Sequence, residues 1–241
     1  MQPLSNEQRD SLAAELNAAA QKVWTQNEAG IWTIRIRESE PLSFEEAGLD
    51  SVTEELSNLS LTKIYNLNKT DGTNVYWAQL SNGQQIAIRR AYESGLELRS
   101  NAPYVCQAFS IKIFDGIKYE ILPLIAMIDD GTGERVPPNQ DNSVEIIENY
   151  DLFVGLFNHL SRISGYKPFK PLLEIDNGIL PNGLPLQVDP GATKGRRDPN
   201  NIEQAYKLWE AEEDRLNLPE NCRWMQDGRP VQETLFPNPF D

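Results

Sequence analysis

The sequence predicts an α+β protein. We expect a mainly antiparallel meander sheet of about six strands, an N-terminal helix, two later helices and a long irregular C-terminal arm. Two observations predict this class. Segments that alternate polar and apolar residues follow one another through the first half of the chain with short turns between them, which is typical of antiparallel hairpins. Three other segments repeat their apolar residues at helical spacing.

The first helix is predicted over residues 5–27. Ser5 and Gln8 have the spacing of a capping box, in which each side chain bonds the backbone N–H of the other residue. One apolar stripe follows, formed by Leu12, Leu16, Ala19, Ala20, Val23 and Trp24. Residues 31–37 (IWTIRIR) alternate as a strand and are expected to join the sheet. The acidic residues 38–58 are expected to form solvated surface.

Three further strands are predicted between Leu61 and Arg90, with the sequences LTKIYNL, VYWAQL and QIAIRR. The clearest hairpin follows over residues 103–130, with Asp115 and Gly116 at its turn. Beyond Tyr119 its second strand is apolar on both faces, which predicts a strand that is covered on both sides.

The register of this hairpin can be predicted from the faces of its strands. A two-residue turn would place Ile111 and Ile113 opposite charged residues. A three-residue loop over 114–116 instead places Ile113 opposite Ile117 and separates apolar from polar side chains. We therefore predict the three-residue loop, with Gly116 in the left-handed conformation as a bulge.

A loop over residues 129–142 carries the candidate metal ligands. Asp129, Asp130 and Glu134 flank two glycines and could bind Ca²⁺ or Mg²⁺. A dedicated calcium loop would need more oxygen ligands at defined steps, so a polar turn is the alternative interpretation.

The only histidine, His159, borders the apolar stripe of a helix predicted from Asp151 to Ser164. A His-based metal site is excluded because no second histidine and no closely spaced cysteine pair accompany it. A general base with a carboxylate partner is the remaining chemical role, and a residue at the edge of a packed helix is the structural alternative.

Residues 166–200 are rich in proline and glycine yet carry many apolar residues, so we expect an irregular path that lies on a surface. The sequence GATKGRR within it lacks the spacing of a phosphate loop. Its basic residues Lys194, Arg196 and Arg197 are nevertheless the candidate anion-binding residues. A last helix is predicted over residues 201–216, with an acidic, solvated side formed by Glu210, Glu212, Glu213 and Asp214.

The tail, residues 217–241, has neither helical nor strand periodicity but holds large apolar side chains. It either wraps its own domain or docks into a neighbouring subunit through aromatic anchors. The candidate partner-binding residues are Trp224, Met225, Leu235, Phe236 and Phe240. The predicted domain boundaries enclose a helix-and-sheet domain over 1–142, a helical region with a long loop over 143–216, and this tail.

Composition restricts the function further. The 241 residues carry a formal net charge of −14, which repels nucleic acid and anionic membranes at long range. Cys106 and Cys222 have neither metal-ligand nor disulfide spacing. No apolar stretch is long enough for a membrane span, and the first residues lack the pattern of a signal peptide. We expect a soluble protein of the cytoplasm or of an intracellularly assembled particle, with no cofactor.

These observations favour a non-enzymatic structural or adaptor subunit of a larger assembly, for example a virion or phage-tail-like particle component. Its expected partners are protein subunits of the same assembly, and a homo-oligomer is one such form. The alternative is a metal-dependent hydrolase or nuclease that uses carboxylates near Asp129 and Asp130. A third hypothesis is a small protein that contacts nucleic acid through residues 194–197, which the acidic composition disfavours.

Overall fold

The computed structural model describes residues 1–35, 41–43, 45–47, 61–68, 75–91, 102–114, 116–127, 150–163, 167–168, 177–188, 193–194 and 201–241. Within these residues helices combine with antiparallel sheets, so the α+β class is confirmed. The helices are α1 (Asn6–Val23), α4 (Tyr150–Ile163), α5 (Ile202–Arg215), the 3₁₀ turn η5 (Glu220–Cys222) and α6 (Val231–Leu235). The largest sheet has the strands β3 (Leu61–Asn68), β4 (Val75–Leu80), β5 (Gln85–Arg90), β6 (Ser110–Phe114) and β7 (Ile117–Pro123).

Helix α1 forms as its sequence predicts. Ser5 Oγ accepts a hydrogen bond from the Gln8 backbone N–H at 3.2 Å, and Gln8 Oε1 accepts from the Ser5 N–H at 3.0 Å. This capping box satisfies two of the backbone donors that a helix start leaves unpaired. The predicted stripe is the buried face, formed by Leu12, Leu16, Ala19, Ala20 and Val23.

The segment after α1 differs from the prediction. The helix ends at Val23, and β1 (Trp24–Gln26) pairs antiparallel with β2 (Trp32–Ile34) in a separate two-stranded sheet. Asn27 causes this reversal, because its Oδ1 accepts hydrogen bonds from the backbone N–H groups of Ala29 and Ile31 at 3.0 and 2.9 Å. Most of the strand predicted over 31–37 therefore lies outside the large sheet.

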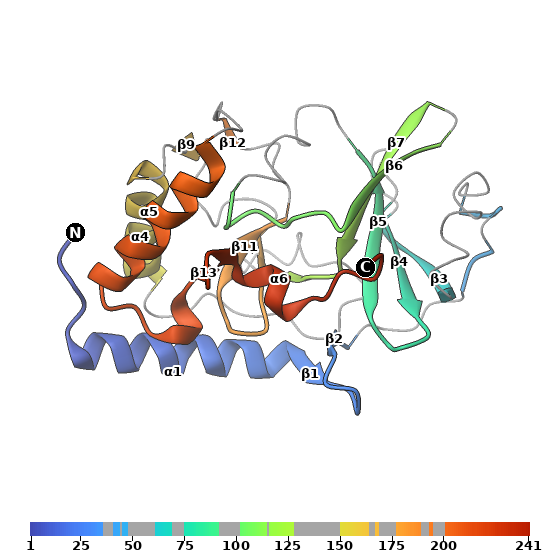
Figure 1. Cartoon of the computed structure of the whole chain (residues 1–241). Helices are drawn as coiled ribbons and strands as arrows, with labels where there is room; N and C mark the ends of the chain where they lie inside the picture. The colour runs from blue at the N-terminus through green and yellow to red at the C-terminus, as the bar shows by residue number, and fades with distance from the viewer. Residues whose placement is uncertain are drawn as a thin grey trace.

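Among the described residues, the large sheet has five strands in the order β3-β4-β5-β7-β6, and all neighbouring strands are antiparallel. The predicted six-strand meander included the segment 31–37. Part of this segment forms β2, which pairs with β1 in the separate sheet, so the large sheet has one strand fewer than predicted. Strands β6 and β7 project from the body of the molecule as a hairpin, and β6 is an outer strand (Figure 1).

The predicted register of this hairpin is wrong. Ile111 pairs with Glu120 and Ile113 with Lys118, so the turn has two residues rather than three. Gly116 does adopt the left-handed conformation, with φ of +77°. The prediction assumed that the isoleucines face inward and the charges outward. Instead Glu120 is buried, because Arg89 on β5 donates a hydrogen bond from Nε at 2.7 Å to its carboxylate.

The proline-rich region contributes two small sheets. Strands β8 (Ala126–Met127), β10 (Asn177–Ile179) and β11 (Pro185–Gln187) form a three-stranded antiparallel sheet in the order β11-β10-β8. A second sheet pairs β9 (Lys167–Pro168) with β12 (Thr193–Lys194). The apolar residues of the β10–β11 hairpin are buried, namely Ile179, Leu180, Leu184 and Leu186.

Helices α4 and α5 lie side by side at the opposite end of the molecule from the large sheet, and α1 runs along one side of the body (Figure 1). The tail continues from α5 through η5, through the paired strands β13 (Met225–Gln226) and β14 (Arg229–Pro230), and through α6. It then crosses toward the sheet, where Gln84 Nε2 donates to the Pro237 carbonyl at 2.8 Å.

Two groups of buried apolar side chains hold these elements together. The main core joins one face of the large sheet, through Trp77 and Leu122, to Leu12 of α1, Phe157 of α4 and Trp209 of α5. The other face of the sheet covers a smaller core that includes Tyr76, Ile86, Ile88 and Ile121. Residues of all three predicted segments contribute to the main core, and the division at 142 and 216 stays a prediction.

Candidate functional site

Three of the predicted partner anchors lie inside the chain itself. Trp224, Met225 and Phe236 are at most 5% exposed. The Trp224 indole N–H donates to the Pro185 carbonyl at 3.0 Å, and the Phe236 ring lies 5.6 Å from the ring of Trp24. These side chains complete the main core. The interpretation in which the tail wraps its own domain therefore accounts for them, and none of the three is accessible to a partner.

The remaining two anchors are half-buried. Leu235 packs against the main core. Phe240 packs against the smaller core, and the Lys112 ammonium of β6 lies 5.5 Å from its ring centroid. The end of the chain therefore contacts the outer strand of the large sheet. A cation–π contact of this kind contributes about 0.5–1 kcal/mol at an exposed site.

A buried carboxylate fastens the tail to α5. Glu213 is fully buried, although the sequence predicted it on the solvated side of the helix. Its Oε1 accepts hydrogen bonds from the Trp209 indole and the Trp224 backbone N–H, both at 2.8 Å, and its Oε2 accepts from the Met225 N–H at 3.3 Å. These donors favour the charged form, but burial outweighs them and raises the pKa of Glu213 to about 8.

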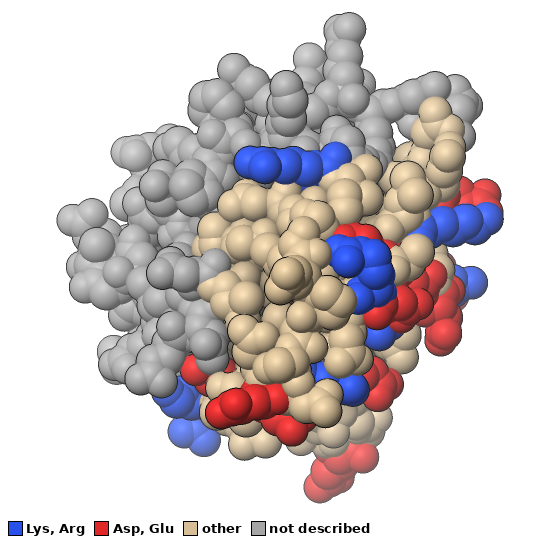
Figure 2. All heavy atoms as spheres, turned by 90° about the vertical axis from the view of Figure 1, so that its left-hand side faces the viewer, with Lys and Arg blue, Asp and Glu red and all other residues tan. Residues whose placement is uncertain are grey.

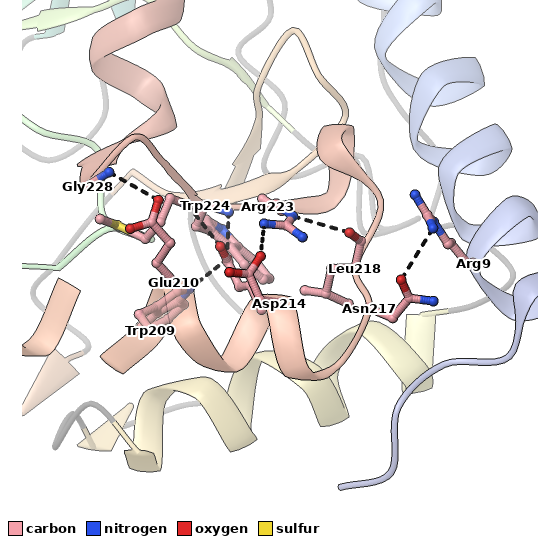
Figure 3. Close-up of polar contacts among 11 residues, drawn as sticks. Arg9, Trp209, Glu210, Asp214, Asn217, Leu218, Arg223, Trp224 and Gly228 are labelled. Atoms are coloured by element: carbon pink, nitrogen blue, oxygen red, sulfur yellow. Dashed lines mark hydrogen bonds and ion pairs between the residues drawn. The ribbon is translucent and has the colours of Figure 1, made fainter. Parts of the chain in front are cut away.

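Further polar contacts surround this carboxylate (Figure 3). Arg223 forms an ion pair with Asp214, and its Nε donates to the Leu218 carbonyl at 3.2 Å. Glu210 accepts from the Gly228 N–H at 3.1 Å. The tail between η5 and β14 is therefore held along α5 by three carboxylates, those of Glu210, Glu213 and Asp214, of which only Glu213 is fully buried.

His159 has a carboxylate partner that the sequence did not reveal. Its Nε2 lies 2.6 Å from Glu212 Oε1, and Arg215 holds the same carboxylate from one turn further along α5. Arg215 also donates from Nη2 to the Met1 carbonyl at 2.9 Å. The cluster thus joins α4, α5 and the first residue. Hydrogen bonds from Arg215, and to a smaller extent from His159, lower the pKa of Glu212 to about 2.

We expect this cluster to stabilise the fold above the ordinary pKa of a glutamate and to lose that contribution as the pH falls toward 2. The sign follows because the folded state holds the Glu212 proton more weakly than the unfolded state. Arg215 is half exposed, so water screens the pair and the loss should be about 1 kcal/mol. Urea unfolding at pH 6 and pH 2.5 would measure it. Glu212→Gln should lower stability at pH 6 and lower it clearly less at pH 2.5, where part of the Glu212 population is protonated in the folded state; an equal deficit at both values would contradict the assignment.

An imidazole–carboxylate pair can orient a general base, but catalysis also needs a nucleophile or a bound water. Among the hydrogen bonds of the described residues, His159 has none to a serine, threonine or cysteine. Both thiols are buried, and burial raises the pKa of Cys222 to about 12. A thiol with this pKa is protonated at neutral pH and is a poor nucleophile. The described part of the cluster is suited to joining helices.

The predicted metal and anion sites lie mostly outside the described residues. This holds for Asp129, Asp130, Glu134, Arg196 and Arg197, whereas Lys194 belongs to the short strand β12. In the part of the chain that is described, no three His, Cys, Asp or Glu side chains are grouped as a metal site would need.

The helical end of the molecule carries both signs of charge. Figure 2 shows lysine and arginine side chains interspersed with aspartates and glutamates over the described part of this face. A nucleic-acid surface would instead gather positive charge. Across the residues that are described, no helix is both long and apolar enough to cross a bilayer.

The outer strand β6 exposes a pair of large apolar side chains. Ile111 and Ile113 are 43% and 63% exposed and lie two residues apart, on the same face of the strand. The sequence prediction placed both toward the interior. The two-residue turn, which the sequence analysis rejected, pairs both isoleucines with charged residues. Accepting that turn would have predicted the observed register of the two isoleucines. Unpaired strand edges are templates for pairing with another chain, and exposed isoleucines add an apolar contact.

Comparisons with known proteins do not assign the chain to a family. No family model matches the sequence, and no curated protein matches it.

Proposed function

We propose that the chain is a non-enzymatic structural or adaptor subunit of a protein assembly, in the cytoplasm or in an intracellularly assembled particle. One observation carries the proposal, the exposure of Ile111 and Ile113 on the outer strand of a projecting hairpin. Single exposed apolar residues need no explanation, and Met1, Ile163 and Leu208 are of this kind. Two isoleucines side by side on a sheet edge are a feature that soluble proteins usually avoid.

The docking surface in this proposal is the β6–β7 hairpin and not the tail. The aromatic side chains that made the tail a candidate arm are used in the core, as Trp224 and Phe236 show. Removing residues 217–241 would therefore also remove part of the core, and point changes on the hairpin are the cleaner test.

Changing Ile111 and Ile113 together to threonine should release the chain from its assembly. Threonine keeps the β-branched shape, so the fold should lose no more than about 1 kcal/mol. The measurement is the size of the native complex in cell lysate, by size-exclusion chromatography with detection of this chain. We expect the variant to elute as a free chain, and Leu208→Gln, a change at an exposed apolar residue of α5, to elute as the unaltered chain does.

An unchanged complex in the double variant would overturn the proposal. The hydrolase alternative makes a different prediction, since Mg²⁺ or Mn²⁺ should then raise the melting temperature of the unaltered chain but not of Asp129→Asn. Such a metal-dependent shift would favour the hydrolase over the assembly subunit.

A further inference from the structure

The sequence contains three Asn-Gly pairs, at residues 82–83, 177–178 and 182–183. An asparagine that precedes glycine loses its side-chain amide readily, because glycine has no Cβ to hinder ring closure. The backbone nitrogen of the glycine attacks Cγ of the asparagine, and the Nδ2 group leaves as ammonia with the proton of that nitrogen. The resulting succinimide is opened by water at either carbonyl, which gives aspartate or isoaspartate.

The first pair lies at the tip of the loop that joins β4 to β5. The Gly83 N–H donates to the Leu80 carbonyl at 2.9 Å, and Gly83 has φ of +90°. Asn82 Oδ1 accepts a hydrogen bond from the Gln84 N–H at 2.9 Å. The succinimide can therefore form only after this loop opens, because the attacking nitrogen and the side chain are both held in hydrogen bonds.

The loop that joins β10 to β11 repeats this geometry with a second Asn-Gly pair. The Gly183 N–H donates to the Leu180 carbonyl at 2.8 Å, and Gly183 has φ of +92°. Asn182 Oδ1 accepts from the Leu184 N–H at 3.2 Å. The two asparagines thus have the same local structure, and any difference in their reactivity must come from what surrounds each loop.

The surroundings of the two loops differ. Asn82 is exposed, whereas Asn182 is partly buried and its Nδ2, the group that must leave, is buried. The loop of Asn182 also lies directly on α1, since a Cβ at Gly183 would be 2.2 Å from the Leu16 carbonyl oxygen. The third Asn-Gly pair lies in β10, the middle strand of its sheet, where pairing on both sides holds the backbone.

We propose that Asn82 is a site of spontaneous deamidation in the folded protein, and that packing on α1 protects the equivalent Asn182. Local opening costs least where few buried contacts are lost. Opening the first loop gives up an exposed hydrogen bond, in which Asn27 Nδ2 donates to the Asn82 carbonyl at 3.1 Å. Opening the second loop must also withdraw Gly183 from the backbone of α1. This inference does not depend on the proposed assembly function.

The test incubates the purified full chain at pH 8 and 37 °C, with and without concentrated guanidinium chloride. Tandem mass spectrometry of proteolytic peptides then measures aspartate and isoaspartate at each pair. In the folded protein we expect Asn82 to deamidate about tenfold faster than Asn182, or more. In guanidinium chloride the two should react at comparable rates, because glycine follows both and no packing remains.

Asn82→Ser is the control variant. Its hydroxyl can still accept from the Gln84 N–H, but it has no amide to lose. The more acidic form that accumulates in the folded unaltered chain, measured by ion-exchange chromatography, should be largely absent from this variant.

Three results would each contradict the proposal. Asn82 could stay intact in the folded protein while it reacts in guanidinium chloride, which would mean that its loop does not open. Asn182 could react as fast as Asn82 in the folded protein, which would mean that α1 gives no protection. The difference in rate could persist in guanidinium chloride, which would assign it to the neighbouring sequence instead of to packing.

Discussion

Gly183→Ala is expected to destabilise the fold by roughly 3–5 kcal/mol, because the new methyl group has nowhere to go. A Cβ at position 183 would lie 2.2 Å from the Leu16 carbonyl oxygen and 2.5 Å from its carbonyl carbon. These are backbone atoms in the middle of α1, so they cannot move unless the helix moves. Gly183 also has φ of +92°, which an L side chain rarely adopts. Urea unfolding followed by far-ultraviolet circular dichroism would measure the loss.

Gly30→Ala is the matched control. Gly30 has φ of +77°, but a Cβ added at this position would meet no other atom within 4 Å. This variant should lose only about 1–2 kcal/mol, which is the cost of left-handed backbone for an ordinary residue. The difference between the two variants isolates the contact of the β10–β11 turn with α1. Equal losses would mean that this turn does not pack directly on the helix backbone.

Local patterns predicted the elements whose causes are themselves local. The capping box of Ser5 and Gln8 and the buried stripe of α1 depend only on residues within a few positions of each other. The same holds for α4 and α5, whose bounds lie close to the predicted ones. Gly116 took its predicted conformation because the Asp-Gly turn needs positive φ in either register.

The hairpin register depended on a contact that is distant in the sequence. Burial of Glu120 requires Arg89, which lies on a strand 31 residues earlier. A rule that separates charged from apolar faces cannot anticipate such a pair, because the pair lets a charged residue occupy an interior position. The register that pairs Ile111 with Glu120 also leaves Ile111 and Ile113 exposed, and the proposed function depends on this exposure.

The position of Glu213 was within reach of the sequence. Helix α5 buries Ala205, Trp209 and Glu213, which are spaced four residues apart and so share one face. The acidic residues beside Glu213 suggested a solvated side. The donors that decide its position come partly from Trp224 and Met225 in the tail, and no local periodicity connects them to α5.

Glu213→Ala should cost roughly 4–6 kcal/mol, a large part of the stability of a typical domain. The change leaves the Trp209 indole N–H and the Trp224 and Met225 backbone N–H groups buried without their acceptor. Each stranded donor costs about 1–3 kcal/mol. Glu210→Ala is the control on the same helix, because Glu210 accepts from the exposed Gly228 N–H and should cost less than about 1 kcal/mol. Similar losses in both variants would contradict the buried attachment.

Glu213→Gln tests the same carboxylate without relying on a strongly destabilised protein. Burial raises the pKa of Glu213 from an ordinary 4.5 to about 8, so the folded state binds this proton more tightly than the unfolded state. The stabilising effect is therefore complete below pH 4.5 and is lost as the pH rises through 8, at up to about 1.4 kcal/mol per pH unit.

Glutamine resembles the protonated acid and does not titrate. Its carbonyl oxygen can accept from Trp209 and Trp224. Its NH2 group takes the place of Oε2 and cannot accept from the Met225 N–H, so only this longer hydrogen bond is lost. The variant should be about 1 kcal/mol less stable than the unaltered chain at pH 5 and at least as stable at pH 9. Urea unfolding of both proteins at pH 5, 7 and 9 measures the difference between their free energies of unfolding. The other titrating groups are the same in both proteins, so their contributions cancel in this difference. A stability difference that stays constant over this range would show that the tail is fastened by a carboxylate that is charged throughout.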